Sequence, residues 1–303
     1  MDALSHALVT ATLFLAFKSP SSLLPFAVIG AVILDADIFF MILSDKSPAL
    51  YLFTHGGVAH SITGAGVMSA LAAAGIWLAS LLGVIPASVI TIPMFTGFFV
   101  LLAGSLVHLG IDVLAYPGIP VFYPLSERKI TLGLLPGPSI LLFITSSSVL
   151  LALALGRVSI TQALAIATTV AILFLAFRSV MVLAMRHKQP RGRLVPLPNP
   201  FHWIIIGEDE NAVSVSRYSF PGGIYSTETF EKYTNTDLHE TEQFLFLSEI
   251  RRLKFHSYST AVEKTRSEFI FSDPLREKGY FLYPPNYRRW VIEIPVQSGG
   301  NED

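Results

Sequence analysis

Long apolar stretches fill the first 185 residues, and they constrain the fold of this chain more than any other feature. That part holds only 12 charged side chains, whereas residues 186–303 hold 31. A helix needs about 20 apolar residues to cross the hydrocarbon layer of a bilayer. The charge asymmetry therefore predicts a membrane-embedded part followed by a water-soluble domain.

Six apolar segments predict the helices of the membrane part. They cover roughly residues 4–17, 22–43, 58–82, 88–115, 138–156 and 160–185. The first is short, so we expect it to be half-embedded or to span with help from its neighbours. In the third, Gly66, Ala70 and Ala74 recur at helical spacing, which predicts a close-packed face. We expect an all-α polytopic domain of about six helices.

Three domains follow from these boundaries: a membrane domain at 1–185, a basic and proline-rich linker at 186–200, and a soluble domain at 201–303. The linker contains "RHKQPRGR" and "LVPLPNP", whose prolines are typical of an extended connection. The soluble domain is expected to be a small α+β or mostly-β fold.

The soluble domain is predicted from local patterns. Two β-branched runs around an acidic turn predict a hairpin at 201–220, and further strands are expected at 265–275 and 288–297. Residues 234–257 predict a helix, with Thr236 or Asp237 as its N-cap.

Positive charges predict the orientation in the membrane. With six alternating spans, most Lys and Arg residues of the membrane part and linker fall on one side, and only Lys18 and Arg157 fall on the other. We therefore expect a multi-pass protein of the cell (inner or plasma) membrane with both termini in the cytoplasm. The lipid bilayer is its expected partner, and a net charge of −1 gives no indication of nucleic-acid binding.

Ionisable residues inside apolar segments are the candidate functional residues, because each costs about 2.5–3.5 kcal/mol at the centre of a membrane helix. The predicted topology brings seven of them to one depth, near the cytoplasmic face. The seven candidate metal ligands are His6, Asp35, Asp37, His55, His60, His108 and Asp112. His6, His60, His108 and Asp112 are the strongest candidates.

Residue spacing indicates how some of these side chains are presented. His108 and Asp112 are four residues apart, so they share one face of a helix. Asp35 and Asp37 are two apart and point to nearly opposite sides of a regular helix, so either one is not a ligand or the helix is broken there. His55 is expected to approach from the following Gly-Gly turn, since the glycines permit it.

Imidazoles together with carboxylates suit a borderline divalent ion, zinc first and manganese or iron next. The chain has no cysteine, which excludes thiolate ligands. The number of candidates permits one or two ions. Asp35 and Asp37 are the candidate catalytic residues, because a carboxylate without a metal bond can act as general base.

Four stretches in order carry a family resemblance: "SHALVT", "LDADIFF", "THGGVAHSITG" and "LVHLGIDVLAYPGIPVFYPLS". They resemble the YdjM-type family of membrane-bound metal-dependent hydrolases, over about residues 1–140. Three positions depart from that family's pattern: Leu34 stands for Pro, Gly56 for Arg and Ala59 for Thr. The resemblance therefore implies no phosphate contact from an arginine at position 56.

A more distant likeness is to the zinc-dependent phospholipase C and single-strand nuclease superfamily, although its second His-x-x-x-Glu is not evident. The resemblance implies a membrane-embedded metal-dependent hydrolase. Its substrate is expected to be a phosphoester or another ester, with lipids among the candidates, and metal-activated water is expected to attack at the cytoplasmic membrane face. Two alternatives stay open: a divalent-metal transporter, and a non-catalytic membrane anchor with a structural metal site.

Overall fold

A computed structural model describes residues 2–137, 139–188, 192–281 and 291–296. The chain divides into two compact units, which are treated separately below. The first unit comprises residues 1–41, 53–190 and 195–202, and the second comprises residues 42–52, 191–194 and 203–303.

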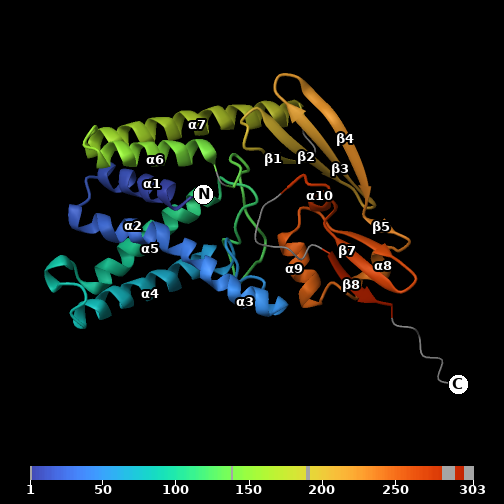
Figure 1. Cartoon of the computed structure of the whole chain (residues 1–303), viewed down its shortest axis with the longest axis horizontal. Helices are drawn as coiled ribbons and strands as arrows, with labels where there is room; N and C mark the ends of the chain where they lie inside the picture. The colour runs from blue at the N-terminus through green and yellow to red at the C-terminus, as the bar shows by residue number, and fades with distance from the viewer. Residues whose placement is uncertain (1, 138, 189–191, 282–290, 297–303) are drawn as a thin grey trace. The chain divides into compact units, whose positions relative to one another are not determined.

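Apolar helices build the first unit (Figure 1). They are α1 Ala3–Ala16, α2 Leu24–Ile33, α4 Ile62–Leu81, α5 Met94–Asp112, α6 Ile140–Ala154 and α7 Ile160–Lys188. Among the described residues, four stretches are long and apolar enough to cross a membrane: Ser21–Lys46, Ile62–Leu81, Met94–Asp112 and Ile160–Lys188. Helix α1 has 14 residues, a length of about 21 Å against roughly 30 Å of bilayer hydrocarbon.

The stretch Ser21–Lys46 is not one uniform α-helix. Helix α2 ends at Ile33, a 3₁₀ segment η2 follows over Leu34–Phe40, and α3 covers Met41–Lys46. The remaining 3₁₀ turns are η1 Ser21–Leu23, η3 Pro48–Leu50, η4 Val58–His60 and η5 Ala87–Val89. The sequence analysis left two possibilities: one of Asp35 and Asp37 is not a ligand, or the helix is broken there. The 3₁₀ segment shows that the α-helix is broken at these residues.

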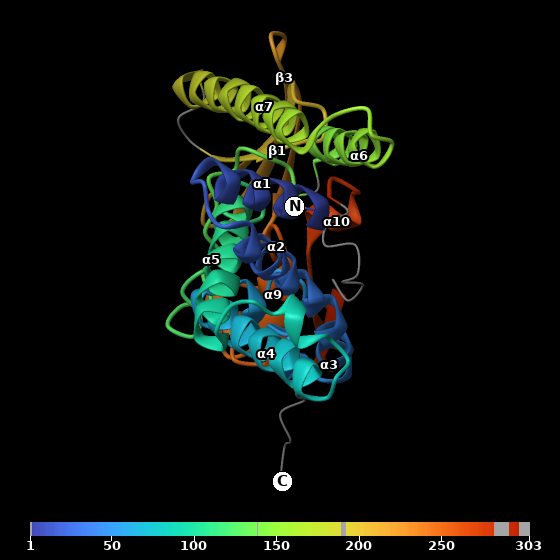
Figure 2. The ribbon, with the colours of Figure 1, turned by 90° about the vertical axis from the view of Figure 1, so that its left-hand side faces the viewer.

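Helix α1 lies between two groups of helices within the first unit. It contacts α2 and α5 on one side and α6 and α7 on the other, an arrangement that both views show (Figures 1 and 2). Helices α4 and α5 also pack together. Helices α1 and α5, which carry candidate ligands, are thus in contact with each other. The two 3₁₀ segments that carry candidate ligands, η2 and η4, also contact each other.

Two glycines allow α2 and α5 to approach closely. A Cβ on Gly104 would collide with the carbonyl oxygen of Ala27, and one on Gly30 would collide with the carbonyl oxygen of Leu101. The Ser105 hydroxyl donates to the Gly30 carbonyl at 2.8 Å across the same contact. The close-packed face expected at Gly66 is not formed within the described part of the chain, where a Cβ on Gly66 would meet nothing within 4 Å.

Replacing Gly104 by valine is expected to separate α5 from α2 and to destabilise the first unit. The colliding atom is backbone, so it cannot move aside as a flexible side chain would, and overpacking of this kind costs about 1–3 kcal/mol. We expect thermal unfolding in detergent to shift down by about 5 °C. Gly66→Val is the matched control, and equal melting temperatures of the two variants would contradict the packing argument.

Two four-stranded sheets follow α7. The first has the order β1-β2-β3-β4 and the second has the order β5-β6-β7-β8. Their strands are β1 Arg193–Pro196, β2 His202–Glu208, β3 Ala212–Ser219, β4 Gly223–Glu231, β5 Tyr233–Thr234, β6 Ala261–Lys264, β7 Glu268–Ser272 and β8 Val291–Pro295. Pairing is antiparallel for β3–β4, β6–β7 and β7–β8, and parallel for β5–β6.

Most local predictions for this part agree with the structure. The hairpin expected at 201–220 is formed by β2 and β3, and the strand expected at 265–275 contains β7. The last predicted strand contains β8, while its residues 288–290 and 297 lie outside the described residues.

The single helix expected over 234–257 is wrong. Two helices, α8 Leu238–Glu242 and α9 Ser248–His256, are separated by turns. Asp237 is the N-cap of α8, as its side chain accepts from the Glu240 amide. The break places Phe244 against two rings of β7. The centroid of the Phe244 ring lies 4.9 Å from that of Phe269 and 5.8 Å from that of Phe271.

A segment far away in the sequence belongs to the second unit. Residues 42–52 cluster with the sheets rather than with the apolar helices. Within this unit the Tyr51 ring packs edge-on to Phe255 at 5.6 Å, and Arg252 lies 3.6 Å from the Asp45 carboxylate. The short helix α10, Pro274–Glu277, begins at its N-cap Asp273.

Candidate metal centre

The seven ionisable residues singled out in the sequence lie together in the first unit, on α1, η2, α5 and the segment that ends in η4. Among the described residues, two groups of three side chains could each hold a metal ion. Within each group, one ligand atom from every residue lies within 4.8 Å of the others. One group is His6, Asp112 and His108; the other is Asp35, His55 and His60. Asp37 touches both histidines of the second group.

His108 is oriented by the backbone of α2. Its Nδ1 donates to the Ala31 carbonyl at 2.6 Å, and because a carbonyl only accepts, the proton must be on Nδ1. Nε2 then carries the lone pair. It lies 3.2 Å from Asp112 Oδ2, one turn along α5, and 3.1 Å from Nε2 of His60. This tautomer leaves Nε2 available to a cation.

Asp37 orients the two histidines of the preceding loop. Its Oδ1 lies 2.8 Å from His55 Nδ1, and its Oδ2 accepts from the Gly56 amide at 3.1 Å. Oδ2 also lies 2.8 Å from His60 Nδ1, in an ion-pair contact rather than an aligned hydrogen bond. Gly56 has a φ of +74°, a conformation that glycine adopts at little cost. Both imidazoles thus keep Nε2 for another partner.

The 3₁₀ geometry of η2 explains how Asp35 and Asp37 both reach the cluster. Residues two apart stand about 120° apart in a 3₁₀-helix, compared with about 160° in an α-helix. Asp35 Oδ1 lies 3.7 Å from Nε2 of His60 and 3.7 Å from Nε2 of His108. Asp37 contacts the opposite nitrogen of His60.

His6 joins the cluster from α1. Its ring stacks on that of His108, with centroids 3.6 Å apart and planes inclined by 13°. Its Nε2 lies 3.3 Å from Asp112 Oδ1, while Oδ2 of the same carboxylate faces His60 at 3.4 Å. The two oxygens of Asp112 therefore face different histidines, an arrangement that suits either one shared ion or two neighbouring ions.

A divalent cation fits this set of donors. Three carboxylates are gathered with four imidazoles, and the Nε2 atoms of His60 and His108 face each other at 3.1 Å. Both ring nitrogens of His6 and Oδ1 of Asp35 are buried without a hydrogen-bond partner among the described residues. Buried charge and lone pairs without a partner are costly, and nitrogen and carboxylate ligands together suit zinc, manganese or iron.

Access to the cluster is one-sided. His55 exposes 34% of its side chain and Asp35 exposes 18%, whereas the side chains of His60 and His108 expose 1% or less. A molecule that approaches the cluster therefore meets Asp35 and His55 first.

Two groups that position the candidate ligands were missed by sequence reasoning: the Ala31 carbonyl and the Gly56 amide. Both are backbone groups, and no side-chain pattern signals them. Gly56 was expected only to permit the turn after His55 and to depart from a family pattern, whereas its amide also holds the loop on Asp37.

The helical part of the chain matches a family model. The model describes the YdjM inner membrane protein and covers residues 1–187. This chain belongs to the YdjM inner membrane protein family. Together with the four apolar stretches, this membership shows a membrane protein. The match ends at the C-terminus of α7, so the two sheets lie beyond the shared family region.

No curated protein and no solved structure matches the chain. Membership of the family by itself assigns no reaction. The hydrolase activity and the relation to the phospholipase C and nuclease superfamily stay predictions.

Proposed function

We propose that this YdjM family member is a membrane-embedded, metal-dependent hydrolase of a phosphoester or another ester. The observation that carries the proposal is the 3.1 Å approach of His60 Nε2 and His108 Nε2. Nδ1 of His108 donates to the Ala31 carbonyl, and Nδ1 of His60 lies 2.8 Å from Oδ2 of Asp37. Second partners of this kind are typical of histidines that bind a metal.

His6, His108 and Asp112 would hold one ion, with His60 and His55 available for a second. Zinc is the first candidate, with manganese or iron next. When bound, such an ion polarises the ester and lowers the pKa of a water molecule towards about 7.

Asp35 is the residue we assign as general base, in preference to Asp37. It is partly exposed, and Oδ1 has no hydrogen-bond partner among the described residues. Both oxygens of Asp37 are occupied. Asp35 would take a proton from water as the water oxygen bonds to the phosphorus or carbonyl carbon. The ester bond to the alcohol then breaks, and the alcohol leaves with the proton that Asp35 took from the water.

The orientation is part of the proposal. The positive charges of the loops favour cytoplasmic termini, which would place the ligand-bearing helix ends at the cytoplasmic face. A site at the depth of the lipid headgroups would receive substrates from either the membrane or the aqueous phase.

Metal-dependent turnover tests the function directly. Purified protein is stripped with a chelator, reloaded separately with zinc, manganese or iron, and supplied with p-nitrophenyl carboxylate esters and bis-p-nitrophenyl phosphate. We expect at least tenfold more product from one loaded form than from the stripped form. Absence of turnover from every metal-loaded sample would remove the hydrolase proposal.

A divalent-metal transporter is the second candidate, because the span that carries Asp35 and Asp37 is interrupted by a 3₁₀ segment. Transporters hold their ions at such broken helices. The absence of a detectable sequence repeat counts against this reading. Uptake of zinc into proteoliposomes, with no ester turnover, would favour it over the hydrolase.

A further inference from the structure

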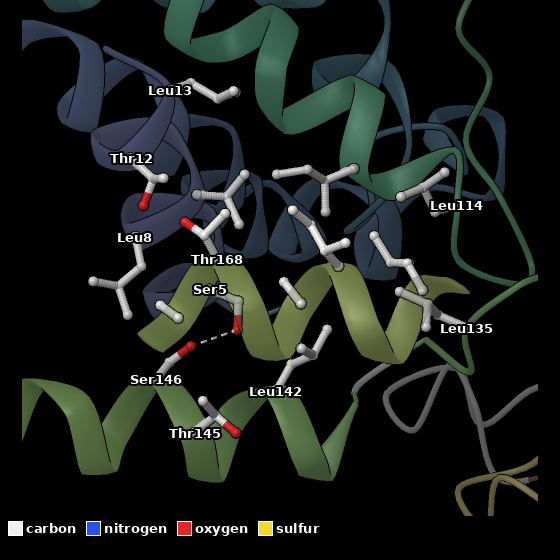
Figure 3. Close-up of a pocket in the computed structure, with 16 residues that line it drawn as sticks. Ser5, Leu8, Thr12, Leu13, Leu114, Leu135, Leu142, Thr145, Ser146 and Thr168 are labelled. Atoms are coloured by element: carbon white, nitrogen blue, oxygen red, sulfur yellow. Dashed lines mark hydrogen bonds between the residues drawn. The ribbon is translucent and has the colours of Figure 1, made fainter. Parts of the chain in front are cut away.

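An apolar pocket lies beside the metal cluster and takes no part in holding it. Its volume is about 300 Å³, and α1, α6 and α7 form most of its wall. Figure 3 shows Leu8, Thr12 and Leu13 at one end and Leu114 and Leu135 at the other. No charged side chain lines it among the described residues. Small-molecule pockets have volumes of about 300–1,000 Å³, so this one has room for part of a single chain.

The pocket and the metal cluster share two stretches of backbone. Ser5 lines the pocket and precedes His6, and Ile111 lines it and precedes Asp112. Consecutive Cα atoms are about 3.8 Å apart. A molecule in the pocket therefore touches residues of α1 and α5 that are next in sequence to two candidate ligands.

Helices α6 and α7 have no other evident part in the site, since neither supplies any of the seven candidate ligands. Their contribution next to α1 is the pocket wall, which includes Leu142, Ala167, Ala171 and Leu175. Helix α7 is itself a candidate membrane span. The molecules that surround such a wall in a bilayer are hydrocarbon chains.

Hydroxyl groups set this pocket apart from a plain hydrocarbon surface. The Ser5 hydroxyl donates to Asp2 Oδ2 at 2.8 Å, so across their 3.1 Å contact the Ser146 hydroxyl donates to Ser5 (Figure 3). The Thr12 and Thr168 hydroxyls are buried and have no hydrogen-bond partner among the described residues. Such groups are costly in an apolar environment. Apart from these hydroxyl groups the pocket wall is apolar, with no charged side chain among the described residues.

We infer that the pocket binds the acyl chain of the substrate, so that the substrate of this hydrolase is an acylated lipid. The inference rests on the proposed function. It follows from the apolar lining and from the backbone that the pocket shares with His6 and Asp112. The ester group to be cleaved then lies at the cluster while the chain extends between α1, α6 and α7.

Photolabelling tests chain binding without any need for turnover. Wild-type protein in lipid nanodiscs receives a phosphatidylcholine with a diazirine in its acyl chain, and the labelled peptides are identified by mass spectrometry. Ala167→Trp fills the pocket, while Ala165→Trp, at an exposed position of the same helix, is the matched control. We expect Ala167→Trp to lower labelling of pocket residues at least fivefold and Ala165→Trp to change it less than twofold.

Chain-length preference provides the second measurement. For p-nitrophenyl esters of two and eight carbons, we expect wild type to prefer the longer chain at least tenfold in kcat/KM. Ala167→Trp should lose that preference, whereas Ala165→Trp should keep it. Ala171→Phe is a second filling variant, and each variant must elute as a single species from size exclusion.

Failure of the pocket inference can be distinguished from failure of the hydrolase proposal. Unchanged labelling in both filling variants overturns the pocket inference, even if short esters are hydrolysed. Pocket-specific labelling with no turnover of any ester leaves a lipid-chain site and removes the hydrolase.

Discussion

Protein that carries His108→Ala is expected to retain less than about a tenth of the divalent metal bound by wild type. His108 is the point at which both groups of candidate ligands meet, since its Nε2 lies within 3.7 Å of His60, Asp35 and Asp112. Loss even of a group that only orients a ligand lowers metal affinity by about 10- to 100-fold. Removal of a ligand should cost at least as much.

The measurement is metal content by mass spectrometry after purification and reloading with zinc. His239→Ala is a suitable control, because this histidine is exposed in the second unit and belongs to neither candidate group. Asp112→Ala should behave like His108→Ala, as its two oxygens face His6, His60 and His108. Unchanged metal content in both ligand variants would refute the metal centre and, with it, the proposed chemistry.

Asp35→Asn is expected to lower kcat by at least about 100-fold while metal content stays within a factor of two of wild type. An amide has nearly the shape of a carboxylate but cannot take a proton, and general bases contribute about 10²- to 10⁴-fold to rates. The measurement is turnover of the best substrate from the metal-loaded screen, with metal content determined on the same sample.

Asp37→Asn distinguishes the role of Asp37 from that of Asp35. Asp37 contacts Nδ1 of His55 and of His60, so we expect its amide variant to bind metal about 10- to 100-fold more weakly. Added zinc should then restore much of its activity, but not that of Asp35→Asn. If Asp37→Asn keeps its metal and loses turnover while Asp35→Asn stays active, the two assignments must be exchanged.

The candidate residues could be predicted because a charged or imidazole side chain is costly in an apolar segment. His108 and Asp112 stand out for this reason, and their spacing of four residues places both on one face of α5 whatever the rest of the fold does. His6 could be placed only through the expected topology. Its stacking on His108 depends on α1 packing against α5, which its own sequence does not specify.

Close packing was misplaced for a physical reason. Glycine and alanine at helical spacing are common in any apolar helix, so Gly66 was selected although nothing packs against it. The glycines that admit a neighbouring backbone are Gly30 and Gly104, and only the crossing of α2 and α5 reveals them. That crossing also brings the Ala31 carbonyl to His108.

Local patterns were sufficient where the local backbone decides the structure. The hairpin of β2 and β3 and the cap at Asp237 follow from alternation and from a side chain that accepts from its own helix. The break between α8 and α9 does not, because it depends on Phe244 packing against β7, some 25 residues further along the chain.

By itself, the sequence determined that the first part of this protein lies in a membrane, that a domain with strands follows it, and which imidazoles and carboxylates are out of place in apolar helices. Those properties depend on residue type and short-range spacing. Only the tertiary structure decided that Asp35 and Asp37 reach the cluster together, which nitrogen of each histidine faces it, and that a pocket adjoins it. Those properties depend on the crossing of helices and on a 3₁₀ segment, whose energies are set by contacts between distant parts of the chain.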